Sequence, residues 1–394
     1  MSRYGLKSAE TRLLLACCGG GEIGEYARDL DWGRTLRRAE ASGLAPAVYG
    51  RLKRWPRLAP EAVLGAFQAR YLETAASNLR QMHRLGEVLR VLEERSIPAM
   101  LLKGAALLTL VYRDPGLRPM TDVDLLVRRE QLRPAAQALY EAGLAPAAAL
   151  AGREKEYARK HHHLIPCVSR DGGLAVELHH NVVPAGGRIR AGTEEMWRRA
   201  QPVKVGNAAA WAPAPSDLLL HLAIHAAGAQ VFDRSLGGLH DIAQTVRCLG
   251  KSIDWTELVE TAGAWNASRH AYCCLRLAEN MLPSGIPDEA IERLRTLSGF
   301  RLGEHGILLR TAEFLVLRPP AERVVQFDVQ EKLWDLALAP GRVWEKTTGA
   351  ARIVRQALAL SARVAKPDLP AAVLPFYAAL VHPWVRLRRR MSAE

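Results

Sequence analysis

Cysteine usage excludes two classes of protein at the outset. The 394 residues include only six cysteines, four of them in two adjacent pairs, and no two stand in Cys-x-x-Cys spacing. Structural zinc sites and small secreted proteins need cysteines at suitable intervals. The sequence therefore predicts neither a zinc framework nor a disulfide framework.

Long apolar runs are also missing. A membrane-spanning helix needs roughly 18 apolar residues without a break, and the nearest stretch, residues 369–384, is interrupted by prolines. Near the N-terminus the apolar run is only LLLACC, preceded by the acidic Glu10, which is unlike a signal peptide. We expect a cytoplasmic protein with no transmembrane span, while LPFYAALVHPWV near the C-terminus leaves open a peripheral contact with a membrane surface.

The composition is that of a basic globular protein. Hydrophobic residues make up 49% of the chain and charged residues 24%, so the chain can form a hydrophobic core. Chains of this length commonly divide into two or three domains. The net charge of +13 favours a polyanionic partner such as a nucleotide, a nucleic acid or a phospholipid surface. A basic surface without any partner is the alternative.

The pattern of apolar residues divides the chain into three parts. Apolar residues at helical spacing over 32–49 and 77–94 predict a helical N-terminal segment at residues 1–97. Strand and helix patterns alternate over 98–212, and helical patterns return over 213–394. We therefore predict an α+β fold, with a small mixed β-sheet between a helical segment and a largely helical C-terminal half.

Short apolar runs predict the first strands of this sheet. Residues 99–102 form one such run, which ends at Lys103-Gly104 and is followed by a helical pattern. This order predicts a strand, a glycine turn and a helix. A stretch rich in turn formers then leads into a second predicted strand at 121–127, and a helix is predicted from 129 to 142.

Two acids begin the second predicted strand. Residues two apart on a strand point to the same face, so Asp122 and Asp124 present their carboxylates side by side. Like charges this close repel each other unless a cation or a proton neutralises them, and divalent cations prefer carboxylate oxygens. The spacing predicts a metal site.

A third acid lies in a predicted hairpin. An Asp-Gly turn separates two strand patterns, at 163–169 and 174–180, and Glu177 stands among apolar residues in the second. A carboxylate in an apolar strand needs a partner. A metal ion shared with the first two acids would supply it.

Polar groups near these acids predict a phosphate site. Lys103-Gly104 ends a strand and begins a helix, where free backbone N–H groups attract anions, and Gly104 would let a triphosphate approach the backbone. Arg118 is a candidate contact for a triphosphate or for the acceptor molecule in a phosphate-transfer reaction. The alternative is a surface salt bridge. His179 shares the face of Glu177 and is a candidate substrate contact, the alternative being a structural histidine.

Two segments together resemble a known family. LLKGAALLTLVYRDPGLRPMTDVDLLV, at 101–127, resembles the signature of an uncharacterised bacterial nucleotidyltransferase family within the DNA polymerase β-like superfamily. VELHHNVV is similar to the segment that carries the third acid of that family. The resemblance implies that 98–212 is the nucleotidyltransferase core. Better-known members have Gly-Ser where this chain has Lys103-Gly104.

The resemblance also implies a reaction. Asp122, Asp124 and Glu177 would be the catalytic residues and would hold Mg²⁺ or Mn²⁺, while an acceptor hydroxyl attacks the α-phosphate of a nucleoside triphosphate, with ATP expected. By analogy with antibiotic nucleotidyltransferases, Glu177 is the candidate general base. The acceptor stays open between a small molecule, a peptide, tRNA and a protein. Kinase-like phosphoryl transfer and non-catalytic nucleotide binding are the alternative functions.

Histidines elsewhere raise a rival hypothesis. His221 and His225 lie one helical turn apart, and His240-Asp241 is typical of HD-type metal phosphohydrolases. The residue after His221 excludes the His-Glu-x-x-His pattern, so we favour positions beside the nucleotide site for these residues. Consecutive histidines on a strand cannot all face one ion, and we expect no metal role for the tract at 161–163.

Overall fold

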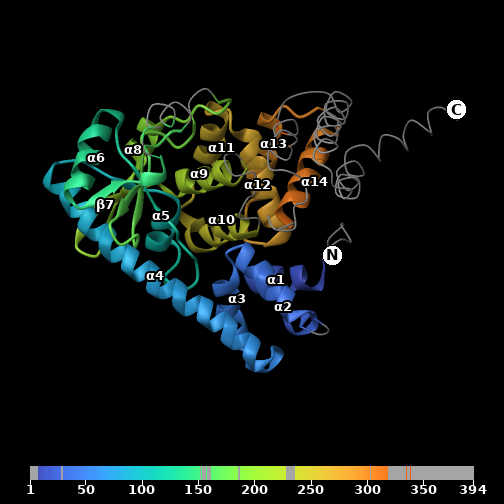
Figure 1. Cartoon of the computed structure of the whole chain (residues 1–394). Coiled ribbons are helices and arrows are strands. Elements are labelled where there is room, and N and C mark those ends of the chain that lie inside the picture. The colour runs from blue at the N-terminus through green and yellow to red at the C-terminus, as the bar shows by residue number, and fades with distance from the viewer. Residues whose placement is uncertain are drawn as a thin grey trace, which may run out of the picture.

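The structure, a computed structural model, describes most of the chain and shows an α+β fold, as predicted (Figure 1). Among the described residues, no helix is both long and apolar enough to cross a membrane. The C-terminal segments discussed above lie outside the described residues. The described residues are 8–27, 30–150, 152, 157, 161–184, 187–227, 236–301, 303–317, 334 and 338.

The N-terminal segment is helical, which confirms that prediction. The pattern over 32–49 is split into two helices at Gly43, whose φ of +66° is a left-handed conformation that glycine adopts without strain. The last of these helices, α4, begins before the apolar pattern at 77–94 and runs for 34 residues. The helices are α1 (Ala9–Gly19), α2 (Trp32–Ala41), α3 (Ala45–Leu52) and α4 (Glu61–Glu94).

A mixed seven-stranded sheet follows, in the order β3-β4-β5-β2-β1-β7-β6. The predicted strand, turn and helix around Lys103-Gly104 are confirmed. In the middle of the sheet, β2 pairs antiparallel with β1 and parallel with β5. The strands are β1 (Met100–Leu101), β2 (Val123–Leu126), β3 (Leu144–Pro146), β4 (Cys167–Ser169), β5 (Ala175–His179), β6 (Gln201–Val205) and β7 (Ala208–Ala212).

The sheet differs from the sequence prediction in three places, one of which is the unpredicted edge strand β3. The strand predicted over 163–169 begins only at Cys167, because Pro166 has no N–H to donate to a ladder. Before it, His163 forms an isolated antiparallel bridge to His179. The hairpin β6–β7 was not predicted, since its alanine-rich second strand carries little strand propensity, yet β7 pairs with β1 in parallel.

The remaining helices cover the sheet and build the described part of the C-terminal half, as predicted. Ser216 lies within the first turn of α9, where its hydroxyl donates to the Asp254 carbonyl at 3.0 Å. The other helices are α5 (Lys103–Leu110), α6 (Leu132–Glu141), α8 (Thr193–Arg199), α9 (Pro215–Ala227), α10 (Leu236–Leu249), α11 (Trp255–Ala264), α12 (Ser268–Met281), α13 (Asp288–Leu297) and α14 (Glu304–Leu317).

The sheet lies between α4 and α6 on one side and the helices from α9 onward on the other (Figure 1). Alternation along the central strands separates an apolar face from a polar one. Val123, Leu125, Val176 and Leu178 are at most 1% exposed and point away from the face that carries Asp124. A shift of one residue in the pairing would move these buried side chains to the opposite face of the sheet. Their burial therefore fixes the register of β2 against β5.

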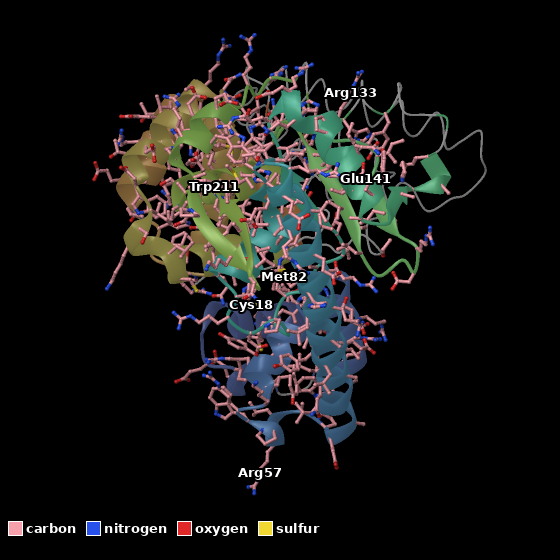
Figure 2. The ribbon with its side chains drawn as sticks, turned by 90° about the vertical axis from the view of Figure 1, so that its left-hand side faces the viewer. Cys18, Arg57, Met82, Arg133, Glu141 and Trp211 are labelled. Atoms are coloured by element: carbon pink, nitrogen blue, oxygen red, sulfur yellow. The ribbon has the colours of Figure 1, made fainter. Side chains whose placement is uncertain are left out.

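The long helix α4 joins the N-terminal helices to the sheet. In Figure 2 it runs from the end of the molecule where Arg57 lies up to the sheet, with Met82 on the way. Its fully buried Asn78 donates to the carbonyls of Pro115 and Arg118, both at 2.7 Å, and accepts from the Met120 N–H at 3.3 Å. Helix α4 thus holds the loop that leads into β2.

We predict that Asn78→Ala lowers the free energy of unfolding by about 2–4 kcal/mol, because two carbonyls and one N–H in the loop lose their partner. Denaturant unfolding followed by circular dichroism measures the change. Leu79→Ala is the matched control, since Leu79 is the next residue of the same helix and is 60% exposed. Equal effects of the two substitutions would show that Asn78 does not hold the loop.

Candidate active site

Three carboxylates meet where β2 and β5 run side by side. Asp124 and Glu177 are direct partners in the parallel register of these strands, and Asp122 immediately precedes β2. One carboxylate oxygen from each of Asp122, Asp124 and Glu177 lies within 4.8 Å of the other two. The structure therefore brings together the three acids that the sequence singled out, and we call them the acidic cluster.

Asp124 is the most buried member of the acidic cluster, at 2% exposure. The Lys103 ammonium donates to its Oδ1 at 2.6 Å, and His179 Nε2 lies 2.8 Å from the same oxygen. Burial alone would raise the pKa of Asp124, but the hydrogen bond from His179 and the charge of Lys103 outweigh it and hold the pKa well below its usual range. The carboxylate is ionised although it is buried.

His179 links two of the acids. Its Nε2 lies 3.4 Å from Glu177 Oε2 in addition to its bond with Asp124, and its side chain is 1% exposed. Burial lowers the pKa of this imidazole, but the hydrogen bonds to Asp124 and Glu177 reverse the effect and raise it above its ordinary value. The predicted sharing of one strand face by His179 and Glu177 is confirmed, and the residue touches the acids directly.

Lys103 reaches Asp124 from an unusual backbone conformation. It is the first residue of α5 and has a φ of +39°, a region that costs a residue with a side chain free energy. The strand–helix turn thereby directs the ammonium toward the acidic cluster. In the structure this charge neutralises Asp124, and the predicted contact of Lys103 with phosphate stays a prediction.

Gly104 is closely surrounded by side chains. A Cβ atom at this position would lie 2.7 Å from Arg118 Nη1 and 2.9 Å from Met120 Cγ. Packing against these two residues is therefore one reason for glycine here, whatever ligand binds nearby. The predicted role of Gly104 in phosphate binding stays a prediction.

Arg118, a candidate triphosphate contact, is paired within the protein. Its guanidinium donates from Nε and Nη2 to the carboxylate of Asp241 on α10, with Nη2 at 3.1 Å from Oδ2, and both side chains are 12% exposed. Tyr112 donates to the same carboxylate at 2.8 Å. The ion pair is buried, unlike the surface pair weighed from the sequence, and it ties the loop before β2 to the C-terminal helices.

Histidines that the sequence analysis set aside also reach the site. His163 Nδ1 lies 3.6 Å from Glu177 Oε2, and its ring stacks at a tilt on that of His179 with centroids 4.7 Å apart. The ring of His162 lies 5.1 Å from that of His179, and burial lowers the pKa of His162 to about 2. The isolated bridge between His163 and His179 produces this proximity, and strand alternation alone could not reveal it.

The C-terminal helices add one histidine near the site. His221 on α9 is 1% exposed, and burial together with the charge of Lys103 lowers its pKa to about 3. His240 is buried on α10, and its neighbour Asp241 is bound by Arg118. Among the described residues, neither His240 nor Asp241 belongs to a group with metal-binding geometry. The arrangement thus does not support the HD-type rival.

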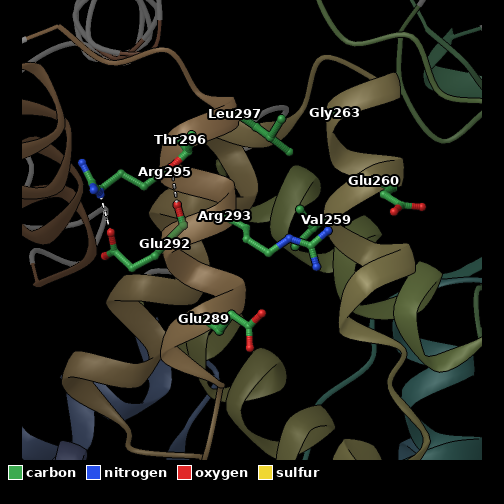
Figure 3. Close-up of a pocket in the computed structure, with 9 residues that line it drawn as sticks. All are labelled: Val259, Glu260, Gly263, Glu289, Glu292, Arg293, Arg295, Thr296 and Leu297. Carbon is green, nitrogen blue, oxygen red and sulfur yellow. Dashed lines mark hydrogen bonds and ion pairs between the residues drawn. The ribbon is translucent and has the colours of Figure 1, made fainter.

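The C-terminal half contains a cleft (Figure 3), and no residue of the acidic cluster lines it. It has a volume of about 600 Å³ and lies between α11 and α13. Its charged lining mixes acids with arginines, and Arg295 pairs with Glu292 at 2.6 Å. None of the site residues predicted from the sequence lines it, and its mixed charge does not favour a triphosphate.

These observations define the class of protein. It has an α+β fold in which the central strands hold three carboxylates close together, beside a basic strand–helix turn. The family model described as "Uncharacterised nucleotidyltransferase" matches residues 28–283, which is more than half of the chain. The chain belongs to this family, and the family name supports a transferase. No curated protein and no solved structure matches the chain.

We predict that the Arg118–Asp241 pair is strongly coupled. Removing either partner, by Arg118→Met or Asp241→Leu, leaves a buried charge alone and should cost about 3–5 kcal/mol of unfolding free energy, whereas the double substitution should cost much less than the sum. Denaturant unfolding of the four proteins measures the coupling. Arg70→Met, which removes an exposed pair with Glu40, is the control and should change stability far less. Additive single effects would contradict the coupling.

Proposed function

We propose that the chain transfers a nucleoside monophosphate from a nucleoside triphosphate to a hydroxyl of an acceptor. The observation that carries the proposal is the acidic cluster on the central strands of a chain that belongs to a nucleotidyltransferase family. Three acids beside a basic turn are the arrangement that nucleotidyl transfer requires. The proposal includes membership of the DNA polymerase β-like superfamily and a bacterial origin.

The residues of the acidic cluster fit a hard divalent cation. All three donors are carboxylates, and Mg²⁺ and Mn²⁺ prefer oxygen ligands. Asp122 and Glu177 are only partly buried, so they face the side from which a substrate can arrive. Mg²⁺ bound by Asp122, Asp124 and Glu177 would neutralise charge on the triphosphate and orient it for displacement.

The surrounding residues have distinct tasks in this proposal. The acceptor hydroxyl oxygen attacks the α-phosphorus, the bond to the bridging oxygen breaks, and pyrophosphate leaves. Glu177 takes the hydroxyl proton as general base. Lys103, His179 and the amino end of α5 keep positive charge near Asp124, where the triphosphate would add negative charge.

The proposal does not use Arg118 as a direct contact of the triphosphate. Because Asp241 and a carbonyl already bind its guanidinium, we assign it to positioning the loop before β2. The basic charge of the chain as a whole suits a polyanionic nucleotide such as ATP. Small molecules, peptides, tRNA and proteins all remain acceptor classes for the reaction.

Label transfer tests the reaction class. Purified protein is incubated with each nucleoside triphosphate, labelled at the α or the γ position, with Mg²⁺ and candidate acceptors. We expect label from the α position on the acceptor and free pyrophosphate. Label from the γ position alone would mean a kinase-like phosphoryl transferase. Triphosphate binding without transfer to any acceptor would mean a non-catalytic nucleotide-binding module.

We predict that the acids separate by role. Asp122→Asn and Asp124→Asn should each reduce the rate by about 10²-fold or more, because they remove charge that holds the metal ion. Glu177→Gln should keep a measurable share of triphosphate affinity while losing about 10²- to 10⁴-fold in turnover. Calorimetry and initial rates measure the two quantities after circular dichroism has established folding. Full activity in both aspartate variants would disprove the metal assignment.

A further inference from the structure

A second group of metal-binding side chains adjoins the acidic cluster. His163, Glu177 and His179 each offer one ligand atom, and these three atoms lie within 4.8 Å of one another. The group shares Glu177 with the acidic cluster but replaces both aspartates with imidazoles. Because imidazole nitrogens suit Zn²⁺ and related transition metals far better than Mg²⁺, the two groups differ in the ions they favour.

The distances within this group suit tetrahedral coordination. Glu177 Oε2 lies 3.4 Å from His179 Nε2 and 3.6 Å from His163 Nδ1. Two ligand atoms of a tetrahedral Zn²⁺ site with bonds of about 2.0–2.1 Å are about 3.4 Å apart, whereas adjacent ligands of an octahedral Mg²⁺ ion are separated by only about 2.9 Å. The two separations from Glu177 are thus close to those of a tetrahedral site, and the ligand atoms of His163 and His179 lie within 4.8 Å of each other.

The surroundings also suit a metal centre. The side chains of His163, Glu177 and His179 are 10%, 17% and 1% exposed, so the ligands are held by packing while one carboxylate stays accessible. The buried ring of His162 packs on both imidazoles. Packing of this kind holds ligand side chains in a fixed geometry, as a metal site requires.

We propose that His163, Glu177 and His179 form a transition-metal site, with Zn²⁺ as the representative ion, next to the acidic cluster. Three protein ligands leave the fourth tetrahedral position for water or a substrate oxygen, which is typical of catalytic rather than structural zinc sites. Binding replaces two hydrogen bonds, from His179 to Asp124 and between His163 Nδ1 and the Leu164 carbonyl at 3.0 Å, and the protons of these two nitrogens pass to the other nitrogen of each ring or to solvent. A carboxylate has two oxygens, so Glu177 can serve both groups. This site does not depend on nucleotidyl transfer.

Metal titration of the full chain tests the site. Protein stripped with a chelator is titrated with Zn²⁺ by calorimetry, in the presence of excess Mg²⁺ to occupy the acidic cluster. We expect one equivalent of tightly bound Zn²⁺, and at least about a 10²-fold loss of affinity in His163→Ala. His161→Ala, from the same histidine tract but outside the metal-binding group, is the matched control and should bind like the parent protein.

Two results would overturn the site. One is unchanged Zn²⁺ affinity in His163→Ala, and the other is loss of Zn²⁺ in Asp122→Asn without loss in His163→Ala, which would place the ion in the acidic cluster. If His163→Ala does not fold, X-ray absorption at the zinc edge of the parent protein decides: two imidazole ligands support the site, and oxygen ligands alone reject it. Label transfer with Mg²⁺ on the stripped protein tests the proposed reaction separately.

Discussion

The negative charge of Asp124 is buried in the middle of the sheet, and much of the site is arranged to keep it there. A carboxylate without partners would be protonated or would unfold the strand, because burial of a charge is costly. Lys103 and His179 each contact the same oxygen of Asp124, one from the strand–helix turn and one from the neighbouring strand. These two contacts leave Asp122 and Glu177 to carry negative charge toward the accessible side.

This charge balance depends on contacts that are far away in the sequence. Asn78 on α4 holds the loop before β2 by three hydrogen bonds, and Asp241 on α10 holds the arginine in that loop. The loop is therefore fixed from both sides of the sheet. A functional site built on central strands and tied to two helices is more rigid than one built on free loops. The rigidity fits a site in which the spacing of ligand atoms selects the ion.

The two groups of potential metal ligands favour different kinds of metal ion. On one side three carboxylates favour hard cations, and on the other the imidazoles of His163 and His179 favour transition metals. Glu177 belongs to both. None of these potential ligands lines the cleft between α11 and α13.

The amino-acid sequence alone was enough to predict the α+β class, the strand–turn–helix at Lys103-Gly104, and the placement of Asp122 and Asp124 on one face. These features follow from local periodicity and turn chemistry, which act over a few residues. The hairpin β6–β7 escaped prediction because its alanines become a strand only through pairing with β1.

Other contacts between side chains far apart in the sequence could not be predicted from local patterns. The sequence made Lys103 a candidate phosphate ligand and left Arg118 open between the triphosphate, the acceptor and a salt bridge. The fold places Asp124 beside the first and Asp241 beside the second. It also brings His163 to Glu177 through a single bridge between segments that the sequence separates with a turn. Strand register and helix packing set these encounters, and both depend on the burial of the whole sheet rather than on any local pattern.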